Sequence, residues 1–147
     1  MMQLRTAHAA DTDAVVDVFQ SARAAALAYL PILHADAEDR AFFGARIASG
    51  ATTVAVEDER ILGFIVLGAA RVEHLYVAPD AWRRGVGGLL LAHARARRGG
   101  GLDLWVFQRN HAAIAFYEAH GFAIVETTGG AGNDEGEPDA RMVWRDT

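Results

Sequence analysis

Cysteine is absent from the 147-residue sequence, which excludes disulfides, thiolate metal sites and a cysteine nucleophile. Long hydrophobic segments are also missing, because the longest apolar run, residues 61–70, is too short to span a bilayer. The N-terminal segment has no apolar signal core. We therefore expect an uncleaved protein of the cytoplasm that makes no contact with a membrane.

The sequence also lacks a cluster of basic residues. Its formal net charge is -5, whereas a nucleic-acid partner requires grouped Lys and Arg to neutralise phosphates. Histidines and carboxylates show no spacing typical of metal ligands, so we expect no metal. With 52% hydrophobic and 22% charged residues, the composition is typical of one globular domain over residues 1–147. An acidic surface attracts cationic amines.

Hydrophobic periodicity predicts a mixed α/β (α+β) chain. Val15, Val18, Phe19, Ala22 and Ala26 form one stripe of the first helix. Asp36 is expected to cap the second helix, and Asp58 lies in the turn of a hairpin. The expected elements are strand 3–5, helix 11–29, helix 36–48, strands 52–57, 60–68 and 71–77, a glycine-started helix ending near 98, strand 102–107, a helix after Asn110, and strands 122–127 and 140–144.

The segment 75–90, LYVAPDAWRRGVGGLL, carries the strongest functional signal. A β-branched and aromatic run ends at a proline, and a glycine cluster then opens a helix. The first N–H groups of a helix have no partner within it and carry partial positive charge, so they bind phosphate well. Glycines allow close approach, and arginines add forked donors. The residues concerned are Arg83, Arg84, Gly85, Val86, Gly87 and Gly88.

Two common glycine motifs do not fit this segment. A Rossmann motif requires glycine at position 90, which is Leu90, and a P-loop requires Lys followed by Ser or Thr after its second glycine. The turn therefore predicts a nucleotide-like anion as ligand, without saying which nucleotide. A turn that binds nothing stays open as the alternative, since lone glycine motifs are weak evidence.

A second motif follows strand 102–107. Asn110 suits a helix N-cap, and Gly121 lies where a helix C-terminal glycine belongs. Between them Ala113, Phe116 and Tyr117 recur at spacings of three and four residues, so this stripe faces an apolar surface.

Together the two motifs resemble the GNAT superfamily of N-acetyltransferases, which transfer an acetyl group from acetyl-CoA to an amine. The first matches at Leu75, Tyr76, Val77 and Pro79 and at Gly85 and Gly87, and the second at Asn110, Ala113, Phe116, Tyr117, Gly121 and Phe122. The resemblance covers most of the chain. It implies a mixed, mostly antiparallel sheet of six or seven strands, flanked by about four helices and splayed between the fourth and fifth strands.

The resemblance also implies which residues bind coenzyme A. Two positions depart from the family: Trp82 replaces the usual Gln or Arg, and Trp105 replaces a glutamate frequent in enzymes that acetylate protein N-termini. The implied coenzyme-binding residues are Leu75, Tyr76, Val77, Arg83, Arg84, Gly85, Val86, Gly87, Gly88, Asn110 and Tyr117.

Direct attack of a neutral amine on the thioester is the mechanism that the resemblance implies. It assigns Tyr117 as the donor to the thiolate leaving group, a task that suits a phenol. Glu73 is our candidate base, because strand alternation puts it on the face of Leu75 and turns His74 to the other face. An ion pair between Glu73 and Arg71 and a proton relay through water are the alternatives.

The acceptor amine is not determined by the sequence. Its pocket is expected between the first two helices and the last loop, with Leu27, Tyr29, Leu30, Ile32, Leu33, His34 and Phe43 contributing apolar surface. The acidic loop 128–139 either attracts an amine through Asp134, Glu135 and Glu137 or forms a solvated connection, and its composition favours the connection. A non-catalytic acyl-CoA-binding or partner-binding module of the same fold, and a homodimer, also stay open.

Overall fold

The chain forms its helices and strands in the order that the sequence predicts. The computed structural model describes residues 1–146. Two short 3-10 helices, η1 (Ala9–Asp11) and η2 (Pro79–Ala81), accompany the main elements. These are β1 (Gln3–Thr6), α1 (Thr12–Ala26), α2 (Asp36–Ala48), β2 (Thr52–Glu57), β3 (Arg60–Leu67), β4 (Val72–Val77), α3 (Val86–Arg97), β5 (Leu102–Phe107), α4 (His111–Ala119), β6 (Ala123–Thr128) and β7 (Asp139–Trp144).

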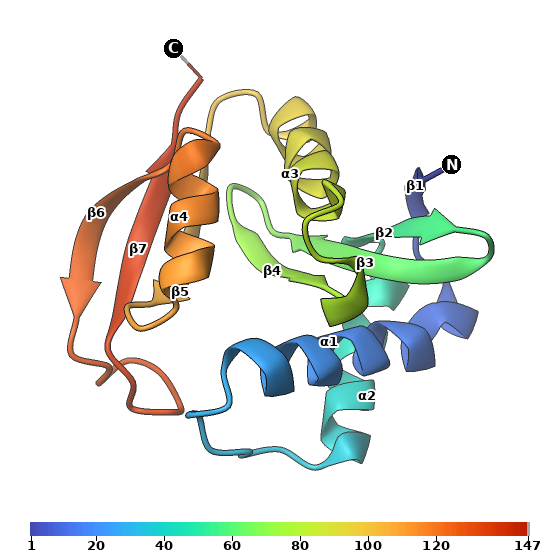
Figure 1. Ribbon diagram of the computed structural model, residues 1–147, viewed down its shortest axis with the longest axis horizontal. Coiled ribbons are helices and arrows are strands. Elements are labelled where there is room, and N and C mark those ends of the chain that lie inside the picture. The colour runs from blue at the N-terminus through green and yellow to red at the C-terminus, as the bar shows by residue number, and fades with distance from the viewer. Residues whose placement is uncertain (147) are drawn as a thin grey trace.

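The strands form two antiparallel sheets. Sheet A has the order β1-β2-β3-β4, and sheet B has the order β5-β7-β6. An isolated parallel bridge between Arg71 and Asp103 links them, with the Asp103 N–H donating to the Ala70 carbonyl oxygen over 2.9 Å. From this point β4 and β5 diverge toward the bottom of Figure 1. The predicted mixed, mostly antiparallel fold with a split between the fourth and fifth strands is confirmed.

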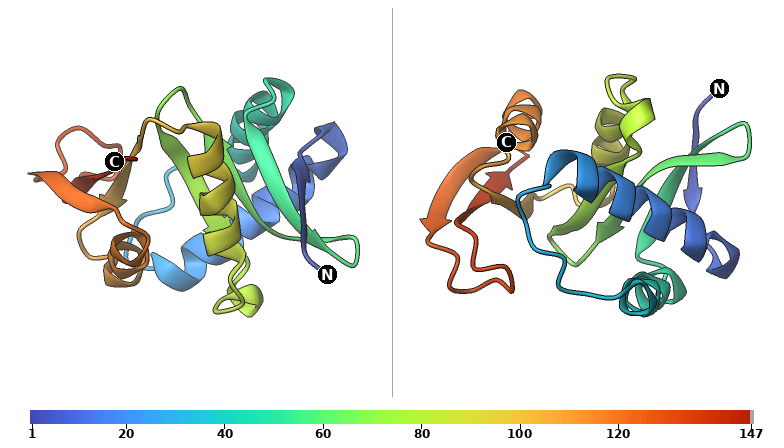
Figure 2. Two further views of the ribbon diagram at one scale, coloured as in Figure 1. Left: turned by 90° about the horizontal axis from the view of Figure 1, so that it is seen from above. Right: turned by 60° about the horizontal axis from the view of Figure 1, so that its bottom comes forward.

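Helices cover the sheets on both sides. In Figure 1, α3 lies above sheet A and α1 and α2 lie below it, and in the right-hand view of Figure 2 α4 lies above the strands of sheet B. The core between these layers consists of fully buried side chains, which include Phe43, Phe64, Leu90, Leu104 and Met142. Within residues 1–146, no helix has the length and apolar character needed to cross a membrane.

Helix α1 differs from the prediction at its end and in its buried stripe. It ends at Ala26 rather than Tyr29, because the chain turns there to reach Pro31, whose carbonyl oxygen accepts from Arg23 Nη2 over 2.8 Å. A residue before proline disfavours helical backbone. Ala26, expected to be buried, is exposed, whereas Val16, outside the predicted stripe, is fully buried.

The start of α2 also corrects the sequence interpretation by one residue. Ala35 is the N-cap, and its backbone N–H donates to Glu38 Oε1 over 3.0 Å. Asp36 is the first helical residue, and its carboxylate accepts from the Gln20 side-chain amide over 2.8 Å instead of capping the helix. This bond joins α1 to α2 beside the cavity described next.

Candidate active site

The glycine turn opens α3 as the sequence predicts. Gly85 is the N-cap, with a φ of +82° that favours glycine. No side chain caps the helix, so the N–H groups of Val86, Gly87 and Gly88 lack a side-chain acceptor at the helix start. The turn therefore presents partial positive charge and backbone donors together.

The two arginines before Gly85 have different environments. Arg84 Nη2 donates to both carboxylate oxygens of Glu57 over 2.7 and 2.8 Å, and this contact lowers the pKa of Glu57. Arg83 forms no ion pair with any residue of the described chain, and its φ of 65° lies in the left-handed region. Arg83 is thus the arginine available to an anion, and Arg84 ties the turn to β2.

Trp82 stabilises the same turn from its other end. Its indole Nε1 donates to the Val77 carbonyl oxygen over 2.8 Å, although the side chain is 43% exposed. The aromatic ring that replaces the family's usual Gln or Arg therefore holds the turn against the end of β4.

The structure brings the two sequence motifs together. A Cβ added at Gly87 would lie 3.1 Å from Phe116 Cζ, so α3 and α4 approach closely there. Asn110 Oδ1 accepts from the Ala113 N–H over 3.2 Å, which confirms the predicted N-cap. Gly121 has a φ of +90° just after α4, which confirms the predicted helix end.

Tyr117 lies on α4 at the split between the sheets. Its ring packs against Phe116 and Phe122, with centroids 5.2 and 5.5 Å away. Burial raises the pKa of the phenol, and the nearby phenol of Tyr76 raises it further. Tyr117 therefore keeps its proton at neutral pH and can act as a hydrogen-bond donor.

A cavity of about 440 Å³ lies on the side of β4 that faces away from α3, between α1, α2 and the β6–β7 loop. We name it the aromatic cavity after the seven rings that line it: Phe19, His34, Phe42, Phe43, His74, Tyr76 and Phe107. Of the seven pocket residues expected from the sequence, Leu27, Leu30, His34 and Phe43 line it, whereas Ile32 is 88% exposed. Five carboxylates also line it: Glu38, Asp39, Glu73, Asp134 and Glu135.

A β-bulge brings Glu73 and His74 to the same cavity. Val66 pairs with His74 and Leu67 pairs with Val72, so Glu73 is the additional residue on β4. Strict alternation, which would separate Glu73 from His74, is therefore wrong here, because a bulge interrupts the period of two. Both residues line the aromatic cavity.

Among the residues described, Glu73 has no hydrogen bond or ion pair with another side chain. The expected alternative partner, Arg71, donates instead to both oxygens of Asp103, over 2.8 and 2.9 Å. Asp39 accepts from Gln20 and Glu38 from Ala35, so these two carboxylates are partly satisfied. Glu73 is left as a carboxylate available to a ligand in the cavity.

His74 and Tyr76 contribute uncharged polar groups to the cavity wall. Burial, together with a smaller effect of the Arg46 charge, lowers the pKa of His74 to about 4. The ring lies edge-on to Phe42 and Phe43, both at 5.3 Å. Burial raises the pKa of Tyr76 to about 12. His74 was missed as a cavity residue because the sequence gives no sign of the bulge.

The acidic loop between β6 and β7 closes the cavity at its mouth. Arg23 Nη2 lies 3.6 Å from Glu135 Oε2, and His34 Nε2 lies 3.9 Å from Asp134 Oδ2. These contacts join the loop, which we call the strap (residues 129–138), to α1 and the α1–α2 connection at the bottom of Figure 1. The interpretation of this loop as a solvated connection is therefore wrong for Glu135, whose side chain is 15% exposed, whereas the Asp134 side chain at the cavity mouth is 79% exposed.

Glu137, the third expected acidic residue, has a different position. Arg109 donates to its two oxygens over 2.7 Å each, and the same guanidinium lies 3.9 Å from the centroid of the Tyr29 ring. Glu137 thus anchors the strap outside the cavity lining. No group of three His, Asp or Glu side chains suited to a metal ion occurs in residues 1–146.

Comparison with known proteins adds to this geometry. Residues 48–124 match the family model of the acetyltransferase (GNAT) domain. Peptidyl-lysine N-acetyltransferase YiaC from Escherichia coli (strain K12) is 40% identical over 102 residues, which cover 68% of this chain and 67% of the relative.

Two solved structures have the same fold over almost all of the chain. A GCN5-related N-acetyltransferase from Rhodopseudomonas palustris is 23% identical with a TM-score of 0.83, covering 97% of this chain and 94% of its own. The PaiA N-acetyltransferase of Thermoplasma acidophilum, in complex with coenzyme A, is 16% identical with a TM-score of 0.80, covering 99% of each chain.

Proposed function

Because the chain belongs to the GNAT acetyltransferase family and is an acetyl-CoA-dependent N-acetyltransferase, we propose that its acceptor is the side-chain amine of a lysine in a peptide or protein. The relative named peptidyl-lysine N-acetyltransferase supports this class of acceptor. The carboxylates and rings of the aromatic cavity support it independently. Carboxylates attract an ammonium group, and aromatic rings bind both the cation and the apolar stem of a lysine.

Coenzyme A is assigned to the opposite side of β4, between α3 and α4. The free N–H groups at the start of α3 and the guanidinium of Arg83 suit its diphosphate. Leu75, Val77 and the backbone of Tyr76 on β4 are proposed to bind the pantetheine arm, while the Tyr76 ring lines the aromatic cavity on the opposite side. Asn110 contributes by fixing the start of α4.

Glu73 is proposed to remove the proton of the acceptor. A lysine ammonium has an unperturbed pKa of about 10.4, so it enters the cavity protonated and must lose a proton before it can attack. The Glu73 carboxylate takes this proton directly or through a water molecule. The neutral nitrogen then forms a bond to the thioester carbonyl carbon, and the C–S bond breaks.

Tyr117 is proposed to donate a proton to the departing thiolate. Its raised pKa keeps the hydroxyl protonated until sulfur accumulates negative charge. The second proton of the attacking nitrogen leaves to solvent, and solvent reprotonates Tyr117. The products are an N-acetylated lysine and the free thiol of coenzyme A.

One observation supports this proposal most directly. Glu73 lines an acidic, aromatic cavity, and the buried Tyr117 lies near Tyr76 of the same cavity. Release of free thiol should be measured with acetyl-CoA and a panel of amines. A lysine peptide should give the highest kcat/KM, above peptides with a free N-terminus and above small diamines. A panel with no thiol release would favour the non-catalytic alternative.

Replacement of the base gives a second test. Glu73→Gln should lower kcat about 100-fold at neutral pH. Glu118→Gln, which changes an exposed carboxylate on α4, is the matched control and should retain the wild-type kcat. An equal kcat for wild type and Glu73→Gln would show that water, and not Glu73, removes the proton.

Four sequence-based predictions complete the proposal. We expect residues 1–147 to act as one N-acetyltransferase domain, in the cytoplasm and without a nucleic-acid partner. The formation of a homodimer also stays a prediction, which sedimentation of the purified protein can test.

A further inference from the structure

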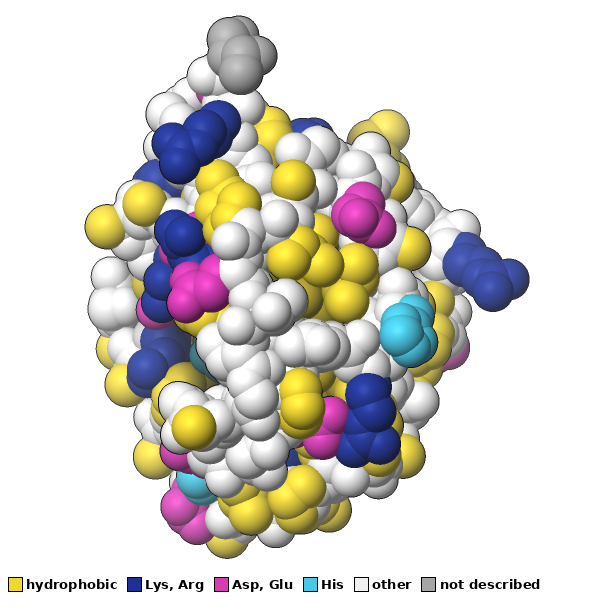
Figure 3. Space-filling model, turned by 90° about the vertical axis from the view of Figure 1, so that its left-hand side faces the viewer, with side chains coloured by type: hydrophobic (Ala, Val, Ile, Leu, Met, Phe, Trp, Pro, Cys, Tyr) yellow, Lys and Arg dark blue, Asp and Glu magenta, His cyan; other side chains and the backbone are white. Residues whose placement is uncertain are grey.

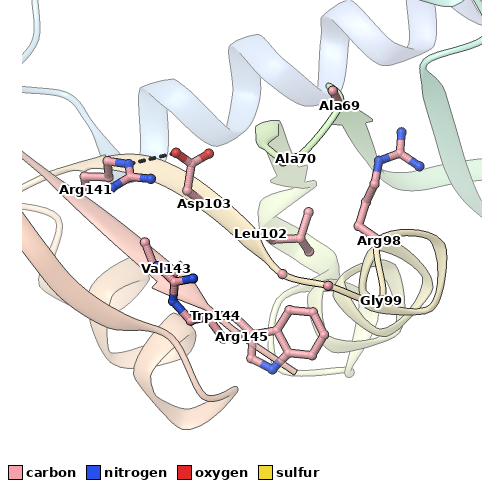
Figure 4. Close-up of a pocket in the computed structure, with 12 residues that line it drawn as sticks. Ala69, Ala70, Arg98, Gly99, Leu102, Asp103, Arg141, Val143, Trp144 and Arg145 are labelled. Carbon is pink, nitrogen blue, oxygen red and sulfur yellow. Dashed lines mark hydrogen bonds and ion pairs between the residues drawn. The ribbon is translucent and has the colours of Figure 1, made fainter. Parts of the chain in front are cut away.

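A second hollow, of about 480 Å³, lies at the closed end of the split between the sheets. It is formed by the turn before β4, the end of α3 with its glycines, and the end of β7. Figure 4 shows Arg98 on one side of it and Arg141, bonded to Asp103, on the other. We name it the arginine hollow after its three lining arginines, Arg98, Arg141 and Arg145.

The hollow has an excess of positive charge. Asp103 accepts from Arg71 and also from Arg141, whose Nε lies 2.7 Å from Asp103 Oδ2, and these contacts lower the pKa of Asp103. One carboxylate is thus shared by two guanidinium groups. Arg145 is exposed and makes no hydrogen bond or ion pair within residues 1–146. Together with Arg98, these groups carry more cationic than anionic charge.

The open face of sheet B connects the arginine hollow with the aromatic cavity. Asp103, Trp105 and Phe107 alternate on β5 and therefore share this face. Asp103 lines the arginine hollow, and Phe107 lines the aromatic cavity. Trp105 lies between them, is 39% exposed, and pairs with Arg141 across the ladder. Four residues of a strand separate the two ends by about 13 Å.

The two ends of this face have opposite charge. Carboxylates line the aromatic cavity, and arginines line the hollow. Figure 3, which looks onto the outer edge of sheet B, shows blue arginine and magenta carboxylate side chains along one margin beside yellow hydrophobic groups. A ligand that is complementary to the whole face carries a cation at one end, an apolar middle and an anion at the other.

We propose that the open face of sheet B binds the peptide around the acceptor lysine and that the arginine hollow selects an acidic residue of that peptide. This inference rests on the proposed lysine acceptor. An extended peptide advances about 3.3 Å per residue, so an acidic side chain three or four residues from the lysine reaches the hollow. Trp105 contacts the intervening residues.

The test compares capped peptides of about nine residues with one central lysine and with Glu or Gln at the third or fourth position before or after it. The enzyme contains no lysine, so every acetylated lysine comes from the peptide. For wild type, Glu on one side should raise kcat/KM about fivefold over Gln, as expected for a partly exposed charge pair.

Arg145→Gln and Arg98→Gln should reduce this Glu/Gln ratio toward one. The ratio separates recognition from a structural effect, because a loss of folded enzyme lowers both rates equally. Arg97→Gln removes an exposed arginine near the same helix end but outside the hollow lining, and it should retain the wild-type ratio. Arg145→Glu should reverse the preference, favouring a peptide with Arg at that position over Gln.

Trp105→Ala gives an independent readout. It should lower kcat/KM for the peptides several-fold relative to a capped single lysine, which is too short to reach Trp105. A Glu/Gln ratio of one for wild type at every position, or an equal effect of Arg97→Gln and Arg145→Gln, overturns the inference while the proposed function stands. Failure to acetylate any lysine peptide overturns both.

Discussion

Tyr117 and His74 are polar residues that burial keeps uncharged at neutral pH. Burial raises the pKa of Tyr117 and lowers that of His74, since each charged form loses its hydration. Glu73 differs from both, because it lines a cavity and has no partner among the described side chains. Burial therefore determines that Tyr117 and His74 are uncharged at neutral pH.

Removal of the Tyr117 hydroxyl should affect turnover more than coenzyme binding. Tyr117→Phe keeps the ring contacts with Phe116 and Phe122 but has no proton to donate, so we expect kcat to fall about 100-fold. The Kd for coenzyme A, measured by calorimetry, should stay within about threefold. Tyr29→Phe is the matched control, because its hydroxyl is buried without a partner in the described chain. Equal kcat for Tyr117→Phe and wild type would contradict the assignment.

The lowered pKa of His74 predicts a pH-dependent stability. Between pH 6.5 and about 4, the unfolded chain binds a proton at this histidine and the folded chain does not. The free energy of unfolding therefore decreases as the pH falls through this window, by roughly 3 kcal/mol at most. His74→Phe keeps the aromatic contacts without titrating, so it should lose correspondingly less stability in urea unfolding at low pH.

The exposed His111 provides the control for this measurement. His111→Gln removes an exposed histidine that does not line the aromatic cavity, and it should follow the wild-type pH dependence. Parallel curves for wild type and His74→Phe would show that His74 takes up its proton equally in the folded and unfolded chain.

At the scale of elements, the start of α3 combines a left-handed backbone conformation with the coenzyme-binding role proposed for it. Gly85 has a φ of +82° and open space around its Cβ position. Gly85→Ala should therefore destabilise the fold by about 1 kcal/mol through conformation alone. We also expect the Kd for coenzyme A to rise about tenfold, because the amides of the turn shift away from the diphosphate.

Gly129→Ala is a matched control for this substitution. Gly129 has neither a positive φ nor a neighbour within 4 Å of an added Cβ. Its unfolding temperature and coenzyme affinity should equal those of wild type. If both variants weaken coenzyme binding alike, the role of Gly85 is not local to the α3 start.

Helices and strands were predicted correctly where the local sequence pattern is strong. Strand 102–107 was predicted with the bounds that β5 has, and Asn110 and Gly121 correctly bracket α4. The bulge at Glu73 could not be predicted, because it depends on how β4 pairs with β3. The strap was misread for a similar reason, since its anchors Arg23 and Arg109 are distant in sequence.

At the scale of the whole molecule, charge is distributed unevenly around a net charge of -5. Carboxylates gather at the aromatic cavity, so a cationic acceptor is attracted to it through solvent. Salt screens this attraction, because the Debye length falls from about 10 Å at 0.1 M to about 3 Å at 1 M. We expect KM for a lysine peptide to rise several-fold over that range of salt, with kcat changed less.

Asp134→Asn tests the origin of this salt effect. Asp134 lines the cavity mouth with a side chain that is 79% exposed. Its removal should raise KM at low salt and make KM less dependent on salt. An unchanged salt dependence would place the attraction elsewhere on the surface.

The sequence by itself determined the order of the elements, the glycine turn at Gly85 that opens α3, and the family. These depend on local signals: periodicity, caps, glycine conformation and the spacing within two motifs. Only the tertiary structure decided that Glu73 and His74 share a cavity, that the strap closes it and that Arg84 binds Glu57. Such contacts join residues far apart in the chain, and strand register and packing, rather than local preference, bring them together.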